Sequence, residues 1–178
     1  MFFLKNKIIN EVFNLSLIHG LKKLTVSEIA ASLKISKKTI YEYFESKDEI
    51  IENVIDLYIS KNYDQLNQQL QNCSTPIEEL KICCYLFLPS PYEFYKKNKD
   101  EIHLFYPKRY TQLQELINFK TNKIIDIYKK GISEGLFSEK INPLAITLMA
   151  KSFLDKEDTE ENLFESFYEI LLYGCIKH

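Results

Sequence analysis

The feature that most limits the possible folds of this chain is its shortage of residues that interrupt helices. The chain has four glycines and five prolines in 178 residues, and no proline precedes Pro76. Glycine and proline are the two residues that most destabilise a helix interior. Apolar residues recur three or four positions apart rather than at alternate positions, which is the spacing of a helix face and not of a strand. The sequence therefore predicts an all-α fold.

Helix-start signals divide the N-terminal part into short helices. A first apolar stripe ends at Gly20, a residue suited to a left-handed C-cap. The segments Thr25 to Glu28 and Ser46 to Glu49 each have the Ser/Thr-x-x-Glu pattern of a capping box, and Ser36 is a third candidate N-cap. After the first helix, these signals predict two short helices and one long helix, over about 25–32, 37–43 and 47–70.

Prolines organise the rest of the chain. Pro76 falls in the first turn of a predicted helix that reaches about Leu88. The next three prolines break the chain repeatedly, so we expect one short, irregular helical piece between Pro89 and Pro107. Farther on, apolar spacing predicts a long helix ended by Gly135 and two more that close the chain, over about 110–134, 142–154 and 159–175.

The composition is that of an ordinary globular protein. Apolar residues make up 46% of the chain and charged residues 27%, within the usual range for a packed domain. The longest stretch without a charge or a polar amide runs from Ile82 to Tyr92, eleven residues, whereas a membrane span needs about 18 or more. Lys5 and Lys7 follow the apolar start too soon for a secretory signal. We expect a cytoplasmic protein with no membrane association.

The four cysteines show neither the paired C-x-x-C spacing of a metal site nor the density of a disulfide scaffold. Buried structural thiols are therefore favoured over a redox or metal role. We predict no metal and no cofactor. The four are Cys73, Cys83, Cys84 and Cys175.

Charge is distributed unevenly along the chain. The net charge is −2, which argues against a protein that coats nucleic acid nonspecifically. Residues 1–50 hold eight lysines against six acids, whereas residues 51–178 hold 15 basic and 19 acidic side chains. The basic excess is thus confined to the end that would approach phosphates, and the acidic remainder would be repelled from DNA.

The stretch from Thr25 to Ile50 has the pattern of a helix-turn-helix. Ala30 is small where two short helices must cross, and Ile35 is placed to fill the turn between them. Ile40 and Phe44 are spaced to pack on the first of these helices. In such a motif the second helix enters the major groove of DNA.

This stretch resembles the tetracycline-repressor (TetR) family of regulators, and the resemblance covers residues 5 to about 58. A weaker likeness to the turn before the family's dimerising helices spans Gly131 to Phe137, followed by Ile141 to Pro143. The N-terminal positions that match the family pattern are Thr25, Ile29, Ala30, Ile35, Ser36, Thr39, Ile40, Tyr41, Tyr43, Phe44, Ser46, Lys47, Asp48 and Glu49.

The resemblance implies a helix-turn-helix DNA-binding domain over residues 1–47 and a helical ligand-binding and dimerisation domain over 48–178. It also implies a homodimer on a near-palindromic operator and a ligand cavity in the second domain. Lys34 and Lys38 stand where the family often has glycine. We expect Lys34 to adopt a left-handed turn conformation, at a cost of roughly 1 kcal/mol, and Lys38 to add charge to the recognition helix.

Eight residues are predicted to contact DNA. Lys37 and Lys38 are candidate base readers because lysine can donate to guanine O6 and N7, and the other polar side chains would position the DNA backbone. For the exposed side chains, the alternative to DNA contact is simple exposure to solvent. For Tyr43 a role in the core competes with DNA contact, and for Phe44 the core role is preferred. The eight are Thr25, Ser36, Lys37, Lys38, Thr39, Tyr41, Tyr43 and Lys47.

An aromatic-rich middle region could line a pocket for a small, partly apolar effector, although ordinary core and surface positions are the simpler interpretation of each residue. A lone histidine such as His103 is more often a hydrogen-bonded structural residue than a ligand contact. The eight candidates are Tyr85, Phe87, Phe94, Tyr95, His103, Phe105, Tyr106 and Tyr128, and Tyr92 and Phe119 belong to the same region.

The last predicted helix is apolar around much of its circumference, so one face should pack inward and another against a second subunit. Burial within a single subunit is the alternative. The candidate dimer residues are Leu144, Leu148, Phe164, Phe167, Tyr168, Leu171 and Leu172.

Other functional classes compete with a DNA-binding repressor. The sequence contains no glycine-rich phosphate loop, nucleophile elbow or metal-spaced His/Cys cluster, so we do not predict an enzyme. A helical protein-interaction module that keeps the headpiece fold, and a transcriptional activator, remain open alternatives.

Overall fold

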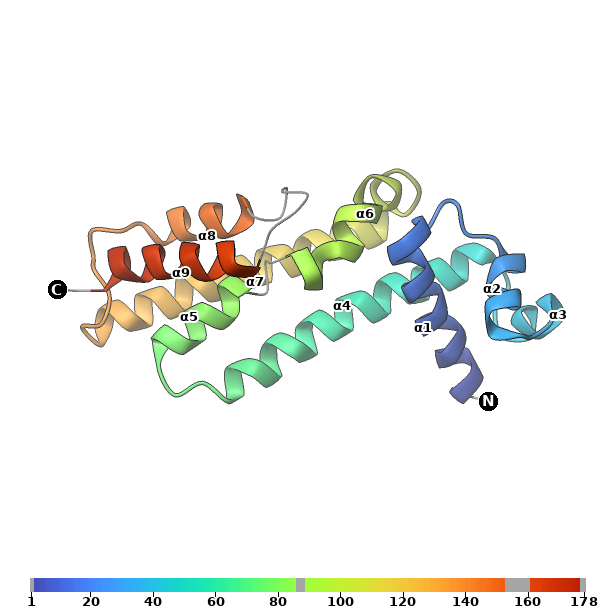
Figure 1. Ribbon diagram of the computed structural model, residues 1–178, viewed down its shortest axis with the longest axis horizontal. Coiled ribbons are helices and arrows are strands. Elements are labelled where there is room, and N and C mark those ends of the chain that lie inside the picture. The colour runs from blue at the N-terminus through green and yellow to red at the C-terminus, as the bar shows by residue number, and fades with distance from the viewer. Residues whose placement is uncertain (1, 86–88, 153–160, 177–178) are drawn as a thin grey trace. The chain divides into compact units, whose positions relative to one another are not determined.

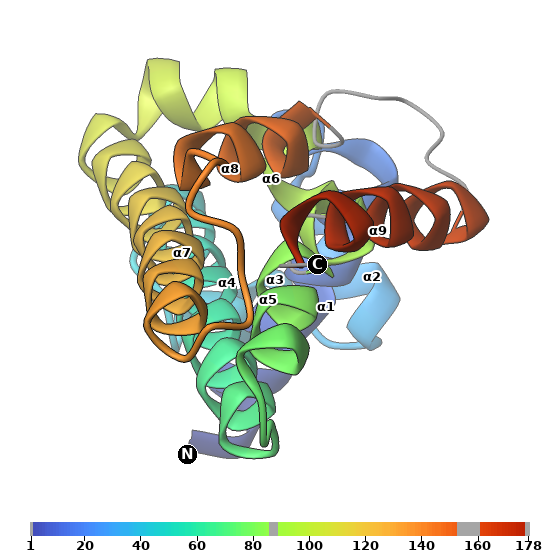
Figure 2. The same ribbon diagram turned by 90° about the vertical axis from the view of Figure 1, so that its left-hand side faces the viewer.

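The computed structural model describes residues 2–85, 89–152 and 161–176, and within these ranges the chain is built of helices (Figure 1), seen from a second direction in Figure 2. The one β-bridge in the described residues is an isolated antiparallel pair of Phe137 and Ile176. The all-α prediction is confirmed. The helices are α1 (Phe2–His19), α2 (Val26–Leu33), α3 (Lys37–Tyr41), α4 (Lys47–Gln71), α5 (Pro76–Tyr85), α6 (Pro89–Phe105), α7 (Pro107–Ser133), α8 (Pro143–Ser152) and α9 (Glu161–Cys175).

The predicted helices of the N-terminal part agree with α2 and α4 to within one residue, and α3 ends two residues earlier than expected. The middle region differs more. Where one short, irregular piece was predicted, α6 is a 17-residue helix, and α7 begins at Pro107 rather than near Tyr110. The reason is that Pro89 and Pro107 each occupy the first helical position, where the missing N–H costs nothing. The predicted ends at 86–88, 153–154 and 159–160 lie outside the described residues.

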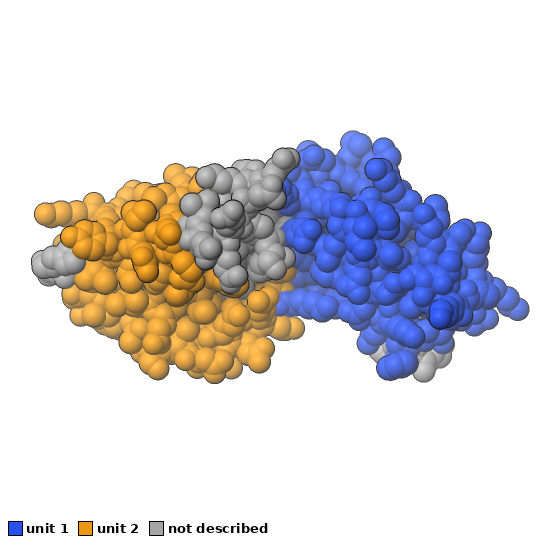
Figure 3. All heavy atoms as spheres, viewed as in Figure 1, with its two compact units in different colours: residues 1–61, 93–113 blue, residues 62–92, 114–178 orange. Residues whose placement is uncertain are grey.

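The chain forms two compact units, coloured separately in Figure 3. Unit 1 consists of residues 1–61 and 93–113, and unit 2 of residues 62–92 and 114–178. Both α4 and α7 contribute residues to each unit. The domain boundary after residue 47 stays a prediction, because this division groups residues by contact and not by function.

The core of unit 1 joins the helix-turn-helix to α1 and α6. Phe94 of α6 is 1% exposed and stacks on Phe13 with 5.2 Å between ring centroids, and the Tyr58 ring centroid lies 4.7 Å from that of Phe94. Burial of aromatic side chains of this size stabilises the unit by a few kcal/mol each. The aliphatic part of the same core includes Ile8, Val12, Leu21, Ile29, Ile40, Ile50 and Val54.

Unit 2 packs α9 against α5, which lie side by side in Figures 1 and 2. The Tyr168 hydroxyl of α9 donates to the carbonyl of Ile77 in α5 at 2.9 Å. The ring of Tyr128 stacks on that of Phe137 at 4.8 Å with an interplanar angle of 8°. The first contact ties α9 to α5, and the second holds the segment after α7 against that helix. In the described residues, no helix combines the length and apolar character needed to span a bilayer.

Candidate DNA-binding interface

The first helix of the motif begins at a complete capping box. The Glu28 N–H donates to Thr25 Oγ1 at 3.2 Å, and the backbone N–H of Thr25 donates to Glu28 Oε2 at 2.8 Å. The Thr25 hydroxyl also donates to Glu28 Oε2 at 2.8 Å. These hydrogen bonds lower the pKa of Glu28. Because the Thr25 hydroxyl hydrogen is directed at Glu28, a DNA phosphate would have to compete for it.

The turn between α2 and α3 depends on a left-handed residue. Lys34 has φ 56° and ψ 41°, which confirms the expected conformation at a position without glycine. Its N–H donates to Ala31, and the N–H of Ile35 donates back to Ala30 at 3.0 Å. These bonds satisfy carbonyls at the end of α2. Ala30 is buried at this crossing, as its small size predicted.

The candidate recognition helix, α3, has one buried and one open side. Ser36 caps it by accepting a hydrogen bond from the Thr39 N–H at 3.0 Å. Ile40 is fully buried, whereas Lys37 and Lys38 are exposed and Tyr41 is 52% exposed. The helix is therefore anchored by its apolar side and presents two ammonium groups and a phenol to solvent.

The start of α4 is fixed to the same assembly. Ser46 Oγ accepts from the Glu49 N–H at 3.1 Å. Lys5 pairs with Glu49 at 3.7 Å and lies over the ring of Phe44, 4.9 Å from its centroid. Phe44 is 2% exposed, so its predicted core role is confirmed. These contacts join α1, the end of α3 and the beginning of α4.

Lys47 occupies a special position among the predicted DNA contacts. It is half-buried, and its Nζ donates to the carbonyl of Lys22 at 3.2 Å. An ammonium has three hydrogens, so this bond leaves others for a phosphate. Lys47 therefore can connect the loop after α1 to the DNA backbone while also supporting that loop.

The structure places all eight predicted DNA contacts in unit 1, on or beside α2, α3 and the first turn of α4. Most are exposed, and three are half-buried: Thr39, Tyr43 and Lys47. Their contact with DNA stays a prediction. They are Thr25, Ser36, Lys37, Lys38, Thr39, Tyr41, Tyr43 and Lys47.

Sequence reasoning missed the α6 side chains that hold the loop entering this motif. Lys97 Nζ donates to the carbonyls of Leu17 and Ile18, each at 2.6 Å, at the end of α1. Asn98 Oδ1 accepts from the Leu21 N–H at 2.8 Å, and Glu101 accepts from the next backbone N–H at 2.7 Å. These partners lie 77 to 80 positions apart in the chain, so local patterns carry no signal for them.

The predicted ligand residues lie in different surroundings. In unit 1, Phe94 and Tyr95 are buried, Tyr106 donates to Asp48 at 2.7 Å, and His103 is exposed with Tyr110 4.4 Å from its ring. Phe105 is 56% exposed. The cavity formed by these residues stays a prediction.

In unit 2, Tyr85 is half-buried, and the buried Tyr128 donates to the carbonyl of Ser138 at 2.9 Å. Phe119 packs on Tyr63 with 4.9 Å between ring centroids. The Phe87 prediction lies outside the described residues, as does the side chain of Tyr92.

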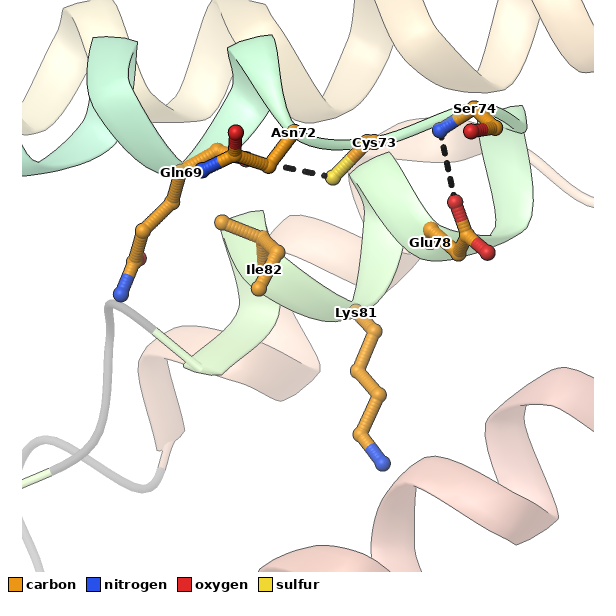
Figure 4. A pocket seen from close by; sticks show the side chains of 7 residues that line it. All are labelled: Gln69, Asn72, Cys73, Ser74, Glu78, Lys81 and Ile82. Carbon is orange, nitrogen blue, oxygen red and sulfur yellow. Dashed lines mark hydrogen bonds between the residues drawn. The ribbon is translucent and has the colours of Figure 1, made fainter.

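An open pocket of about 440 Å³ lies in unit 2 where α4 meets α5 (Figure 4). In Figure 4, Ile82 lies beside Gln69, and the Lys81 side chain extends away from the loop between α4 and α5. The Lys81 Nζ pairs with Glu165 at 3.0 Å. The buried Oε1 of Gln69 has no hydrogen-bond partner. None of the predicted ligand residues lines this pocket, which is formed by Gln69, Asn72, Cys73, Ser74, Glu78, Lys81 and Ile82.

The predicted dimer residues differ in how far they are exposed. Leu144 and Leu148 of α8 are 51% and 67% exposed, whereas Tyr168 and Leu171 of α9 are buried within the subunit. Phe167 and Leu172 are half-buried, and the side chain of Phe164 lies outside the described residues. Three exposed apolar residues of the same helices were not predicted, namely Met149, Ile170 and Tyr173.

The cysteines behave as structural thiols. Cys83, Cys84 and Cys175 are buried, Cys73 is half-buried, and none forms a disulfide. Burial raises the pKa of Cys83 to about 12, so its thiol stays protonated and unreactive at neutral pH. In the part of the chain that the structure describes, no three His, Cys, Asp or Glu side chains are grouped to hold a metal ion.

Comparison with known proteins agrees with this geometry. The sequence pattern of the bacterial regulatory proteins, tetR family, matches residues 15–54. The chain is 28% identical over 134 residues to the HTH-type transcriptional regulator QacR of Staphylococcus aureus, covering 74% of this chain and 70% of that one. It is 28% identical over 126 residues to the HTH-type transcriptional repressor KstR2 of Mycolicibacterium smegmatis, covering 66% of this chain and 60% of the relative.

Solved structures share the whole fold at low sequence identity. A protein described as a transcriptional regulator from Saccharomonospora viridis, in complex with choline, has a TM-score of 0.85 at 15% identity, with both chains fully covered. The ketosteroid regulator KstR2 of Mycobacterium tuberculosis has a TM-score of 0.74 at 14% identity, with 98% of this chain and 95% of that one covered. These likenesses show that the chain shares the all-helical fold of these proteins.

Proposed function

Because the chain belongs to the TetR family of DNA-binding transcriptional regulators, which are not enzymes, we propose that it is a ligand-responsive repressor that binds a near-palindromic operator as a homodimer. The observation that carries this proposal is the two-sided character of α3. Ile40 is fully buried and holds the helix to the core, while Lys37 and Lys38 are exposed to solvent. An ammonium can donate to guanine acceptors in the major groove or to phosphates.

The exposed apolar side chains of α8 and α9 support the homodimer. Leu148, Ile170 and Tyr173 are 67%, 71% and 75% exposed, and a second subunit that covered them would remove this apolar surface from water. A two-fold dimer would present two copies of α3, and its operator would then carry two related half-sites.

The relatives support repression and ligand response. KstR2 of Mycolicibacterium smegmatis is a repressor, and the Saccharomonospora viridis protein was solved with choline. We propose that this chain likewise represses transcription in the cytoplasm until a small, partly apolar effector binds to its helical body. A reporter assay would distinguish repression from the alternative, in which the same DNA-binding headpiece activates transcription.

The test is retardation of promoter fragments from the protein's own genome at low salt. The wild-type dimer is expected to retard at least one fragment containing an inverted repeat, with affinity that falls steeply as salt rises. The double variant Lys37→Ala/Lys38→Ala should lose this retardation but keep its helical content and its dimer mass.

The matched control is Lys129→Ala/Lys140→Ala, which removes the same charge from exposed positions of unit 2 and should leave the affinity unchanged. Equal DNA binding by both double variants would refute the assignment of α3. If the protein instead bound a protein partner with an affinity that did not depend on salt, and retained no DNA, the repressor proposal would give way to that of a protein-interaction module.

A further inference from the structure

The carboxylate of Glu101 in α6 holds the loop that leads into the helix-turn-helix. Glu101 Oε2 accepts from the backbone N–H of Lys22 at 2.7 Å. Asn98, one turn earlier in α6, accepts from the N–H of Leu21 at 2.8 Å. All four residues belong to unit 1. Two successive backbone N–H groups that follow α1 thus find their acceptors on α6, as buried and half-buried backbone groups require.

The same loop residue contacts α4 through its other backbone group. The Lys47 Nζ donates to the carbonyl of Lys22 at 3.2 Å. Glu101 and Lys47 therefore hold the two backbone groups of one residue, the first at its N–H and the second at its C=O. Because Glu101 belongs to α6 and Lys47 to the first turn of α4, the backbone of Lys22 connects the two helices.

The charges on either side of Lys22 reinforce this arrangement. Burial raises the pKa of Glu101, and the hydrogen bond from the Lys22 N–H, together with the positive charges of Lys47 and Lys22, opposes this effect. The Lys47 ammonium is therefore within electrostatic reach of the Glu101 carboxylate. An opposite charge nearby adds to the hydrogen bond in favouring one position of this long, flexible side chain.

The residue next to Lys47 is held by a separate contact. The Tyr106 hydroxyl, from the corner between α6 and α7, donates to Asp48 Oδ1 at 2.7 Å. Tyr106 is 9% exposed, and its contact with the first turn of α4 involves neither Glu101 nor Lys22. Loss of the Glu101 carboxylate is therefore expected to release the loop and the Lys47 side chain without detaching the start of α4.

Building on the proposed role as a DNA-binding regulator, we propose that Glu101 is a positioning residue for operator binding, which acts through Lys22 and Lys47. With Glu101 in place, the Lys47 ammonium is held at the loop with hydrogens left for a DNA phosphate. Without Glu101, this side chain has to be ordered when DNA binds, and the cost of that ordering lowers the affinity. An acid does not itself attract a phosphate. The contribution of Glu101 is the placement of a cation that does.

The first test measures the affinity for a promoter fragment that the wild type retards. Removal of an acid normally strengthens the attraction to DNA, but Glu101→Ala should weaken operator binding by about 3-fold to 10-fold, because it removes the acceptor for the Lys22 N–H. Glu101→Gln loses the same charge but keeps a side-chain oxygen that can accept this bond, so it should bind no more weakly than the wild type. The matched control Asp100→Ala, at an exposed position of α6, should not weaken binding either.

A double-mutant cycle then tests whether Glu101 acts through Lys47. Lys47→Met should lower the affinity and make the dependence of log affinity on log salt shallower by about 0.9, the value for one phosphate contact. In the Lys47→Met background, Glu101→Ala should have no further effect, because the ammonium that Glu101 positions is absent. A purely structural role of Glu101 would give additive losses. Additive losses, an unchanged salt dependence in Lys47→Met, or a Glu101→Gln variant as weak as Glu101→Ala would overturn the proposal.

A second measurement follows the Lys47 amine without DNA. Brief acetylation of the folded protein by acetic anhydride, resolved by mass spectrometry, gives the reactivity of Lys47 relative to that of the exposed Lys37. This ratio should rise by about 3-fold or more in Glu101→Ala, as the hydrogen bond that shields the amine is lost, and should stay at the wild-type value in Glu101→Gln. An unchanged ratio in Glu101→Ala would refute the proposal. A wild type that retards no promoter fragment would refute the repressor assignment, and the labelling would still decide whether Glu101 positions Lys47.

Discussion

The side-chain amide of Asn98 holds the backbone of Leu21, where α1 gives way to the helix-turn-helix. Its Oδ1 accepts from the Leu21 N–H at 2.8 Å, and its Nδ2 donates to the carbonyl of Phe94 at 2.9 Å. Asn98 is 1% exposed, so neither bond competes with water. The backbone N–H at the start of the loop that leads into the DNA-binding motif thus finds its acceptor in α6, a helix far away in the sequence.

Replacing Asn98 by Ala should destabilise the protein by about 1–3 kcal/mol, because the buried Leu21 N–H would lose its acceptor. The measurement is urea unfolding followed by circular dichroism. Asn67→Ala, an exposed change on α4, serves as the control and should change the stability by no more than about 0.5 kcal/mol. Equal stability of the two variants would show that water replaces the lost acceptor.

The DNA-binding motif was predictable because its signals are local. Thr25 pairs with Glu28 and Ser36 with Thr39, three residues apart in each case, so a short stretch of sequence contains the donor and the acceptor together. The left-handed Lys34 and the buried Phe44 also followed from position in a known motif. Helix capping of this kind needs no knowledge of the tertiary fold.

The contacts outside this motif could not be predicted, because they join residues that are far apart in the sequence. The pairing of Asn98 with Leu21 and of Lys120 with Asn62 leaves no periodic trace in the sequence. Apolar spacing also failed to separate the faces of α9. Tyr168, which is a predicted dimer residue, is buried in the subunit, whereas the exposed Ile170 is not among the predicted dimer residues.

Gly131 and Gly174 should respond oppositely to replacement by Ala. A Cβ at Gly131 would lie 2.1 Å from Cδ2 of the Phe137 ring, which stacks on Tyr128, so Gly131→Ala should cost about 1–3 kcal/mol through overpacking. At Gly174 the nearest atom would be Ile141 Cδ1 at 3.9 Å, and Gly174→Ala in α9 should stabilise by about 0.5–1 kcal/mol. Thermal unfolding measures both. A stable Gly131→Ala variant would mean that the Phe137 ring can move.

Introducing a charge at Leu148 should separate the proposed dimer. Leu148 is 67% exposed on α8, and Leu148→Glu would place a carboxylate in the apolar contact between subunits, where desolvation is costly. Light scattering after size-exclusion chromatography should then give the monomer mass at concentrations where the wild type is dimeric. Leu104→Glu, at a 72% exposed position of unit 1, should keep the dimer mass. Dissociation by both variants, or by neither, would place the interface elsewhere.

The pH dependence of stability should reveal the buried charge of Lys120. The folded protein releases the Lys120 proton as pH rises through its pKa of about 8, whereas the unfolded chain keeps it up to about 10.5. Between these values the unfolded state binds more protons, so the free energy of unfolding rises with pH. The contribution of Lys120 should grow by about 1–2 kcal/mol between about pH 7.5 and 9.5.

Other groups titrate in this interval, so the measured quantity is the difference between the wild type and Lys120→Met. The variant should be the more stable protein at pH 7.5, because it buries no charge, and its advantage should shrink as pH rises. Urea unfolding at several pH values gives this difference directly. A difference that stays constant would mean that the Lys120 ammonium is as well stabilised in the folded protein as it is in water.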